Sequence, residues 1–310
     1  MRICLYGLVA LFLLYPSIIR HYKFPFGNKR ISIQDCLNRL TIRPGMDKNQ
    51  RKSIERLISF SQDLKRDTLM LVAEDNCKIA AYYLKGTKKA AVILLHGMGL
   101  NKESMLRHAR FLCNGGYSVL AIDFRSHGNS ETAYVTYGRD ELLDIKIAIA
   151  YLNNRGYEKI ALLGTSFGGA MAIIGASKYR EIDALIVDGG YSQLADALYQ
   201  FSKFGNNKKL PLTLFEIGFG LLRIDAYFSI GKLYFFLDPL DYIGKVKVPT
   251  FIIHGQKDKT VLVKNAYKNY NASNIRGKEM WLDVKKHTPS LWSDYPVYEE
   301  NVLNFLDKSM

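Results

Sequence analysis

Short, unbroken apolar runs alternate with helical patterns from residue 90 onward, and this alternation restricts the fold more than any other feature of the chain. The first run, AAVILL at Ala90–Leu95, has no polar residue, as expected of a strand covered on both faces. Further strands are predicted at Tyr117–Ile122, Ile160–Leu163, Ala184–Val187, Thr250–Ile253 and Met280–Val284. Strands that alternate with helices predict a mostly parallel sheet with right-handed crossovers, hence an α/β fold.

The helical segments fall between these strands and complete the pattern. They are predicted at Glu103–Asn114, 139–154, Phe167–Lys178, 260–270 and Tyr295–Leu306. Before the alternation begins, Thr68–Ala73 and Cys77–Lys85 are predicted to form two antiparallel strands around a short polar turn. With 310 residues, of which 48% are apolar, the chain can bury a substantial core. We therefore predict one α/β domain over residues 67–310.

Residues 191–248 interrupt the alternation with a segment rich in aromatic and apolar side chains. Phe201, Phe204, Phe215, Phe219 and Tyr227 are among them. A long insert at the carboxyl edge of an open α/β sheet usually lies over the ligand crevice. We interpret this segment as a helical cap, and the alternative is a self-packed helical hairpin remote from the substrate.

The N-terminus carries an uncharged apolar stretch, Ile3–Ile19, bracketed by Arg2 and Arg20. As a helix it would span about 26 Å, slightly less than the hydrocarbon core of a bilayer. A cleaved signal peptide is the main alternative, but no small-residue cleavage site follows the stretch. A buried helix is a further alternative. We predict a single-pass membrane anchor over residues 1–22.

The segment that follows, residues 23–66, is predicted to be a basic linker and an amphipathic helix. Half of the net charge of +14 lies between Arg20 and Arg56, where ten Lys and Arg residues face three carboxylates. Such a segment beside an anchor is attracted to anionic headgroups, and no nucleic-acid-binding module accompanies it. The excess of positive charge after the anchor favours a cytoplasmic location for the C-terminal domain. We therefore expect membrane lipids, and no nucleic acid, as partners of this region.

A G-x-S-x-G motif occurs at Gly164–Gly168 and has the right surroundings for a nucleophile. A predicted strand ends at Leu163, and an alanine-containing helix begins at Phe167. Small residues permit a tight strand-to-helix turn, which lifts the hydroxyl of Ser166 above the sheet. The alternative is an ordinary glycine-rich turn with a capping serine. We predict that Ser166 is the nucleophile of a hydrolase.

A serine hydroxyl needs a base to accept its proton, and two histidines follow Ser166 near strand ends. His254 stands directly before Gly255 and is interpreted as part of a turn. His287 lies in a loop beyond the last strand. We predict His287 as the base.

The base in turn needs a carboxylate that fixes its tautomer. Asp258 follows the Thr250–Ile253 strand, whereas Asp188 ends the preceding strand. We predict Asp258 as the acid, with Asp188 as the alternative. The third requirement is a set of donors for the oxyanion. We predict that the backbone N–H groups of Met98 and Phe167 supply them, and that neighbouring His96 is a structural support.

Together these segments resemble the α/β-hydrolase superfamily over roughly residues 68–307. The resemblance rests on HGMG at 96–99, DFRSHGNS at 123–130, GTSFGG at 164–169, DPLDYIGKVKVPTFIIHGQKD at 238–258 and HTPSLWSDYPVYEENVLNFL at 287–306. Within the superfamily the chain looks most like the membrane-anchored, serine aminopeptidase (S33)-like hydrolases, the Bem46-like group. The resemblance implies the order Ser, Asp, His, no cofactor, and a supporting role for Asp123, Arg125 and His127. One departure is Lys285-Lys286, which stands where small residues usually precede the histidine.

No metal-binding spacing is present, since His96, His127 and His254 form no H-x-H or H-E-x-x-H pattern, and no phosphate-binding glycine motif occurs. The four cysteines show no C-x-x-C spacing either. The sequence therefore predicts a serine hydrolase that needs no cofactor or metal and cleaves an ester or related acyl bond, with a small-molecule or lipid substrate. A peptidase, an amidase, a thioesterase and a non-catalytic binding protein on the same fold are the alternatives.

Overall fold

A computed structural model describes residues 64–133, 135–205, 237–283, 287–288 and 296–310. Over these residues the chain forms one eight-stranded sheet in the order β1-β2-β4-β3-β5-β6-β7-β8. The strands are β1 (Asp67–Val72), β2 (Lys78–Leu84), β3 (Ala90–Leu95), β4 (Ser118–Ile122), β5 (Lys159–Thr165), β6 (Ala184–Asp188), β7 (Thr250–Gly255) and β8 (Lys278–Asp283). Strand β2 pairs antiparallel with β1 and β4, and all other pairs are parallel. The predicted α/β architecture is confirmed.

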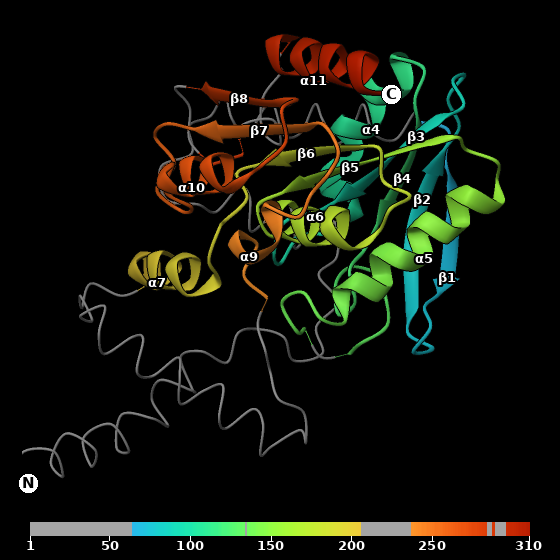
Figure 1. Cartoon of the computed structure of the whole chain (residues 1–310). Helices are drawn as coiled ribbons and strands as arrows, with labels where there is room; N and C mark the ends of the chain where they lie inside the picture. The colour runs from blue at the N-terminus through green and yellow to red at the C-terminus, as the bar shows by residue number, and fades with distance from the viewer. Residues whose placement is uncertain (1–63, 134, 206–236, 284–286, 289–295) are drawn as a thin grey trace, which may run out of the picture.

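Helices cover both faces of this sheet, which gives a three-layer arrangement (Figure 1). Helices α4 (Leu106–Asn114) and α11 (Pro296–Ser309) pack on one face. On the other face lie α5 (Glu141–Asn154), α6 (Phe167–Lys178), α9 (Leu240–Ile243) and α10 (Lys264–Ala272). Helix α7 (Leu194–Gly205) follows β6, and the short 3-10 helix η1 (Lys102–Met105) precedes α4. Because both faces are covered, the central strands consist mostly of apolar residues, as their sequences predict.

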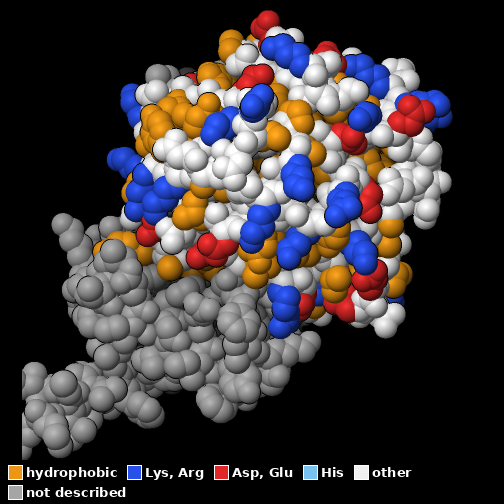
Figure 2. Space-filling view, in the orientation of Figure 1, with side chains coloured by type: hydrophobic (Ala, Val, Ile, Leu, Met, Phe, Trp, Pro, Cys, Tyr) orange, Lys and Arg blue, Asp and Glu red, His pale blue; other side chains and the backbone are white. Residues whose placement is uncertain are grey.

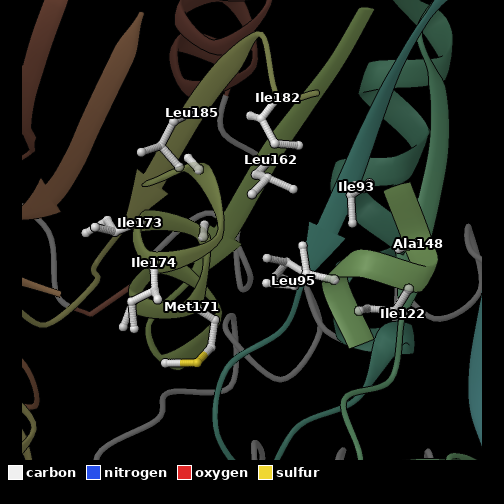
Figure 3. Close-up of a cluster of buried hydrophobic side chains, with 14 of the residues drawn as sticks. Ile93, Leu95, Ile122, Ala148, Leu162, Met171, Ile173, Ile174, Ile182 and Leu185 are labelled. Atoms are coloured by element: carbon white, nitrogen blue, oxygen red, sulfur yellow. The ribbon is translucent and has the colours of Figure 1, made fainter. Parts of the chain in front are cut away.

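The larger core lies between the sheet and helices α5 and α6, as Figure 3 shows. Strands β3, β4, β5 and β6 contribute one buried layer, and α6 contributes the facing layer. The side chains that meet there include Ile93, Leu95, Ile122, Leu162, Met171, Ile174 and Leu185, all fully buried. Helix α6 is therefore held rigidly under the sheet, and the residue at its N-terminus is fixed with it.

Two helices begin three or four residues later than the sequence predicts. The predicted helix over Glu103–Asn114 starts with the 3-10 turn of η1, and α4 proper begins at Leu106. The helix predicted from residue 260 begins at Lys264 instead. In the second case the N–H groups of Thr260 and Val261 donate to the carboxylate of Asp258, so the chain there wraps around that side chain and is not available to a helix.

The insert after β6 leaves and rejoins the scaffold at neighbouring points. The N–H of Leu194, at the start of α7, donates to Asp238 Oδ1 at 2.8 Å, and the N–H of Leu240 donates to the carbonyl of Ser192 at 3.0 Å. Residues 206–236, the middle of the predicted cap, lie outside the described residues. The two ends of the insert, at Ser192–Leu194 and Asp238–Leu240, are therefore tied to each other.

The predicted anchor and basic linker also lie outside the described residues, up to residue 63. None of the helices in the described ranges has the length and apolar character that crossing a bilayer requires. On the face drawn in Figure 2, lysine and arginine side chains are spread among apolar and acidic ones.

Candidate active site

Ser166 occupies the turn between β5 and α6 in a strained backbone conformation. Its φ is 52° and its ψ is −113°, a region that residues other than glycine rarely adopt. Its N–H donates to the carbonyl of Asp188, at the end of β6, at 2.8 Å, and its own carbonyl accepts from Ala170 N–H at 3.1 Å. These bonds hold the strained turn at the carboxyl edge of the parallel strands, with the serine side chain only half-buried.

The two glycines of the motif are required by close contacts between backbones. A Cβ atom on Gly164 would lie 2.1 Å from the carbonyl oxygen of Gly168. A Cβ atom on Gly168 would lie 2.0 Å from the carbonyl oxygen of Leu95 and 2.7 Å from that of His96. The start of α6 can therefore approach the end of β3 only because residue 168 has no side chain.

The loop after β3 passes directly beside Ser166. A Cβ atom on Gly97 would be 3.5 Å from the Cβ of Ser166, so the backbone before Met98 packs against the serine. The loop turns back at once, with Leu100 N–H donating to the Gly97 carbonyl at 3.1 Å. On the other side of the serine, Phe167 opens α6, where N–H groups have no acceptor within the helix. Two segments with backbone donors thus border Ser166.

A buried ion pair anchors the far end of this loop. Asp123 accepts from the backbone N–H of Lys102 and from its Nζ, each at 2.6 Å, and both side chains are buried. Burial acts to lower the pKa of Lys102, but the charges of Asp123 and Glu103 outweigh it and raise that pKa. Lys102 therefore stays charged, and the pair joins η1 to the loop after β4.

His96 supports the loop with both ring nitrogens. Its Nε2 accepts from the N–H of Phe124 at 3.1 Å, so its Nδ1 carries the hydrogen and lies 2.8 Å from the Gly97 carbonyl. Burial, with a smaller contribution from His127, holds the pKa of His96 well below its usual value. The described contacts give His96 a supporting role.

Asp258 and His287 form the second half of the site. Asp258 follows β7, and its Oδ1 accepts from the N–H groups of Thr260 and Val261 at 2.8 and 2.9 Å. Its Oδ2 accepts from Nδ1 of His287 at 2.5 Å. Burial acts to raise the pKa of Asp258, but the charge of His287 and hydrogen bonds from His254 and His287 hold it well below its usual range. An ionised Asp258 therefore fixes the hydrogen of His287 on Nδ1 and leaves Nε2 as the basic nitrogen.

Gly189 lies against the imidazole of His287. This glycine follows Asp188 with a φ of 65°, and a Cβ atom there would lie 3.3 Å from Cε1 of His287 and 2.9 Å from Cγ2 of Thr288. The carbonyl of Asp188 holds the N–H of Ser166. The imidazole and the serine thus both contact the Asp188–Gly189 turn.

Known protein families and solved structures include proteins similar to this chain. A family model described as serine aminopeptidase, S33, matches residues 86–212. The Pyrococcus furiosus esterase Pf2001 has a similar structure, with a TM-score of 0.66 and 26% identity over 81% of this chain and 95% of that one. The chain belongs to the α/β-hydrolase superfamily. It is an enzyme of the serine-hydrolase type.

Two curated relatives of the hydrolase are similar over much of their length. A carboxylesterase of Bacillus subtilis is 23% identical over 238 residues, which cover 73% of the hydrolase and 96% of the relative. A 2-hydroxy-6-oxo-6-(2'-aminophenyl)hexa-2,4-dienoic acid hydrolase of Metapseudomonas resinovorans is 27% identical over 217 residues, covering 60% and 74% respectively.

The alternatives for acid and base take other positions in the hydrolase. Asp188 is fully buried at the end of β6, and its backbone, as described above, contacts Ser166. Among the described residues, the carboxylate that bonds His287 is that of Asp258. His254 is buried in β7, where its Nε2 donates to the carbonyl of Val261 at 2.8 Å.

The charged loop after β4 is used for internal contacts. The buried guanidinium of Arg125 binds Asp144 at 2.7 Å and Asp75 at 2.8 Å, and Nδ1 of His127 lies 2.9 Å from the Arg125 carbonyl. Across the described parts of the hydrolase, no three His, Cys, Asp or Glu side chains are grouped so that they could hold a metal ion.

Sequence reasoning missed Lys102, Gly189 and the contact of His254 with the acid. Gly189-Gly190 directly after a predicted strand is the signal that could have marked the turn under His287. Lys102 gave no signal, because a single lysine after a glycine-containing loop is most often a surface residue.

Proposed function

We propose that the hydrolase cleaves carboxylic esters with Ser166 as nucleophile, His287 as general base and Asp258 as the acid that orients it. The observation that carries the proposal is the 2.5 Å bond from His287 to Asp258 beside the strained Ser166 turn. A serine on a strand-to-helix turn, a histidine whose Nε2 is free of the carboxylate and an ionised aspartate are the three parts that acyl transfer requires.

In this mechanism Oγ of Ser166 attacks the acyl carbon while Nε2 of His287 accepts the hydroxyl proton. The resulting oxyanion is stabilised by the backbone N–H groups of Met98 and Phe167, whose segments border the serine. His287 then gives the proton to the leaving alcohol, and the acyl group stays on Ser166. Water, activated by the same histidine, attacks the acyl-enzyme and releases the acid.

The substrate is proposed to carry an apolar acyl chain. The proposed cap over about residues 191–248 contributes many aromatic side chains by sequence, and its two ends are fixed near the carboxyl edge of the sheet. The relatives named above include an esterase and a hydrolase of a dienoic acid, so the leaving group is to be identified experimentally. The description of the family model favours peptide or aminoacyl amide bonds as a second candidate.

The deciding experiment is covalent labelling with a fluorophosphonate probe, followed by a panel of esters, thioesters and aminoacyl amides. We expect wild type to be labelled and Ser166→Ala to lose both labelling and hydrolysis, apart from the residual rate of the remaining site. Ser177→Ala is the matched control, because its Oγ only bonds the Ile174 carbonyl within α6. A folded Ser166→Ala protein with full activity would falsify the assignment, and absence of labelling in wild type would favour a binding protein.

We further propose that residues 1–22 hold the hydrolase at a membrane as a single-pass anchor, with the domain on the cytoplasmic side. The 17-residue uncharged stretch and the +7 of residues 20–56 support this proposal. A domain tethered in this way would act on acyl substrates in or near the bilayer.

A further inference from the structure

A second histidine lies beside the carboxylate that binds His287. His254 belongs to β7 and is buried, with an exposed fraction of 1%. Its Nε2 is 2.8 Å from the carbonyl oxygen of Val261 and 3.4 Å from Oδ2 of Asp258. Because a carbonyl oxygen can only accept, Nε2 carries the hydrogen. A single N–H group therefore faces both the backbone and the carboxylate of the β7–α10 loop.

This N–H belongs to a strand of the sheet, unlike the two backbone donors to Asp258. The N–H groups of Thr260 and Val261 belong to the same loop as the carboxylate and move with it. His254 is fixed by the sheet, since it pairs with Leu282 of β8 and its strand also pairs with β6. Its N–H therefore links the carboxylate of Asp258 to the sheet.

We propose that His254 is a positioning residue, which fixes the carboxylate of Asp258 relative to the sheet and so sets the orientation and basicity of His287. The inference rests on the proposed catalytic role of Asp258 and His287. Without the N–H of His254, Oδ2 would share its charge with one donor fewer, and its attraction for a protonated His287 would increase. The loop would also lose two contacts with the His254 side chain, one at the carbonyl of Val261 and one at the carboxylate of Asp258.

Other ionisable groups adjoin this position and stay unchanged when His254 is replaced. Asp188 ends β6 and Asp283 ends β8, and both are buried. Lys257 and Lys259 flank Asp258 and are exposed. A shift in the titration of His287 on replacement of His254 therefore reports the lost donor and not a change in these charges.

The test uses two amides of different reach. In His254→Gln the side-chain amide nitrogen can occupy the place of Nε2, whereas in His254→Asn it falls one carbon short. We expect His254→Asn to move the acidic limb of the kcat/KM profile to higher pH by a few tenths of a unit and to lower kcat by about 10-fold. We expect His254→Gln to retain most of the wild-type profile. His108→Asn replaces another buried histidine, far along the chain in α4, and should change stability without moving the profile.

A second measurement makes the test independent of substrate. The deshielded Nδ1 proton of His287 can be followed by NMR through the pH titration in folded wild-type and variant proteins. We expect its titration midpoint to rise in His254→Asn and to stay near wild type in His254→Gln. Equal behaviour of wild type and His254→Asn in both measurements, or equal losses in Asn and Gln, would overturn the positioning role. Failure of the proposed function would give a different result. Wild type would then show the NMR titration but would hydrolyse none of the acyl substrates.

Discussion

Two buried carboxylates stand at the ends of adjacent strands, and only their surroundings distinguish them. Asp258 bonds the imidazole of His287 and accepts two backbone N–H groups. Asp188 reaches the nucleophile through its backbone carbonyl, which a change of side chain leaves in place. The residue that fixes the tautomer of the base is therefore Asp258 in our proposal.

This difference predicts unequal effects of two isosteric substitutions. In Asp258→Asn the amide cannot accept the Nδ1 hydrogen in the same way, so the histidine adopts the wrong tautomer, which lowers kcat by about 10⁴-fold in the serine-protease case. Asp188→Asn should cost far less. The single-turnover rates of both variants are measured with one activated ester, and circular dichroism checks that both are folded. A greater loss in Asp188→Asn would move the acid to the earlier strand.

Single residues of the site could be predicted from sequence where the chemistry is local. The strand, the glycines and Ser166 occur in one short motif, and the order of Asp258 and His287 follows from their places after two strands. The contacts of Lys102, Gly189 and His254 could not be predicted, because each joins segments that are distant in the chain or on different elements. Such contacts depend on how closely helices and strands approach, which the pattern of apolar residues does not specify.

At the scale of elements, the contact of α6 with β3 depends on Gly168. A methyl group there would lie 2.0 Å from the carbonyl oxygen of Leu95, so helix and strand would have to separate. We expect Gly168→Ala to lower the free energy of unfolding by about 3 kcal/mol and to reduce activity strongly. Gly277→Ala is the matched control, because its Cβ would find its nearest atom 3.9 Å away, and it should change stability by less than about 0.5 kcal/mol. Urea unfolding of the two variants compares them, and equal stabilities would contradict the steric argument.

The packing of α4 against α11 predicts a loss of stability in mild acid. Nε2 of His108 lies 3.2 Å from the hydroxyl of Tyr298, and burial, with a smaller contribution from Arg107, lowers the pKa of His108 to about 3. The unfolded chain binds this proton near pH 6.5, so below that pH the unfolded state holds more protons and the folded state loses relative stability.

Between pH 7 and pH 5 this linkage should cost wild type about 2 kcal/mol that a variant without the imidazole does not lose. His108→Gln keeps an amide donor for Tyr298 and removes the titration. Denaturant unfolding at pH 7 and pH 5 measures how the free energy of unfolding changes with pH in wild type and in the variant. Parallel pH dependence in wild type and variant would mean that His108 accepts its proton in the folded state.

The boundaries of elements show where sequence patterns stop being informative. Strand positions were predicted to within two residues, and for strands such as β3 and β6 this was possible because a strand buried on both faces has an almost unbroken apolar run. The start of α10 was predicted four residues too early, since periodicity does not reveal that Asp258 takes the N–H groups at 260 and 261. A functional side chain thus decided a helix boundary.

For the molecule as a whole, the proposed anchor predicts two separable parts. A spanning helix should resist extraction by high salt and by carbonate, whereas a purely electrostatic contact is screened by salt. Deletion of residues 1–20 should release a soluble domain that still hydrolyses esters, because the proposed triad lies wholly beyond residue 160. Membrane fractionation measures where the full-length and the shortened protein are found, and N-terminal sequencing of protein from cells shows whether the stretch is retained. A mature N-terminus near residue 20 would identify a signal peptide, and release by salt alone would indicate a helix lying on the surface.

The two ends of the insert, at Ser192–Leu194 and Asp238–Leu240, are joined by hydrogen bonds. This arrangement affects how such a protein can diversify. A loop whose ends already touch closes at little entropic cost, and doubling its length adds only about 0.6 kcal/mol. Lineages can therefore lengthen, shorten or exchange residues 206–236 without altering the spacing between the nucleophile and its base. Selection for new substrates and selection for the hydrolytic apparatus would then act on different stretches of one gene, and a graft between relatives at these two points should transfer substrate preference alone.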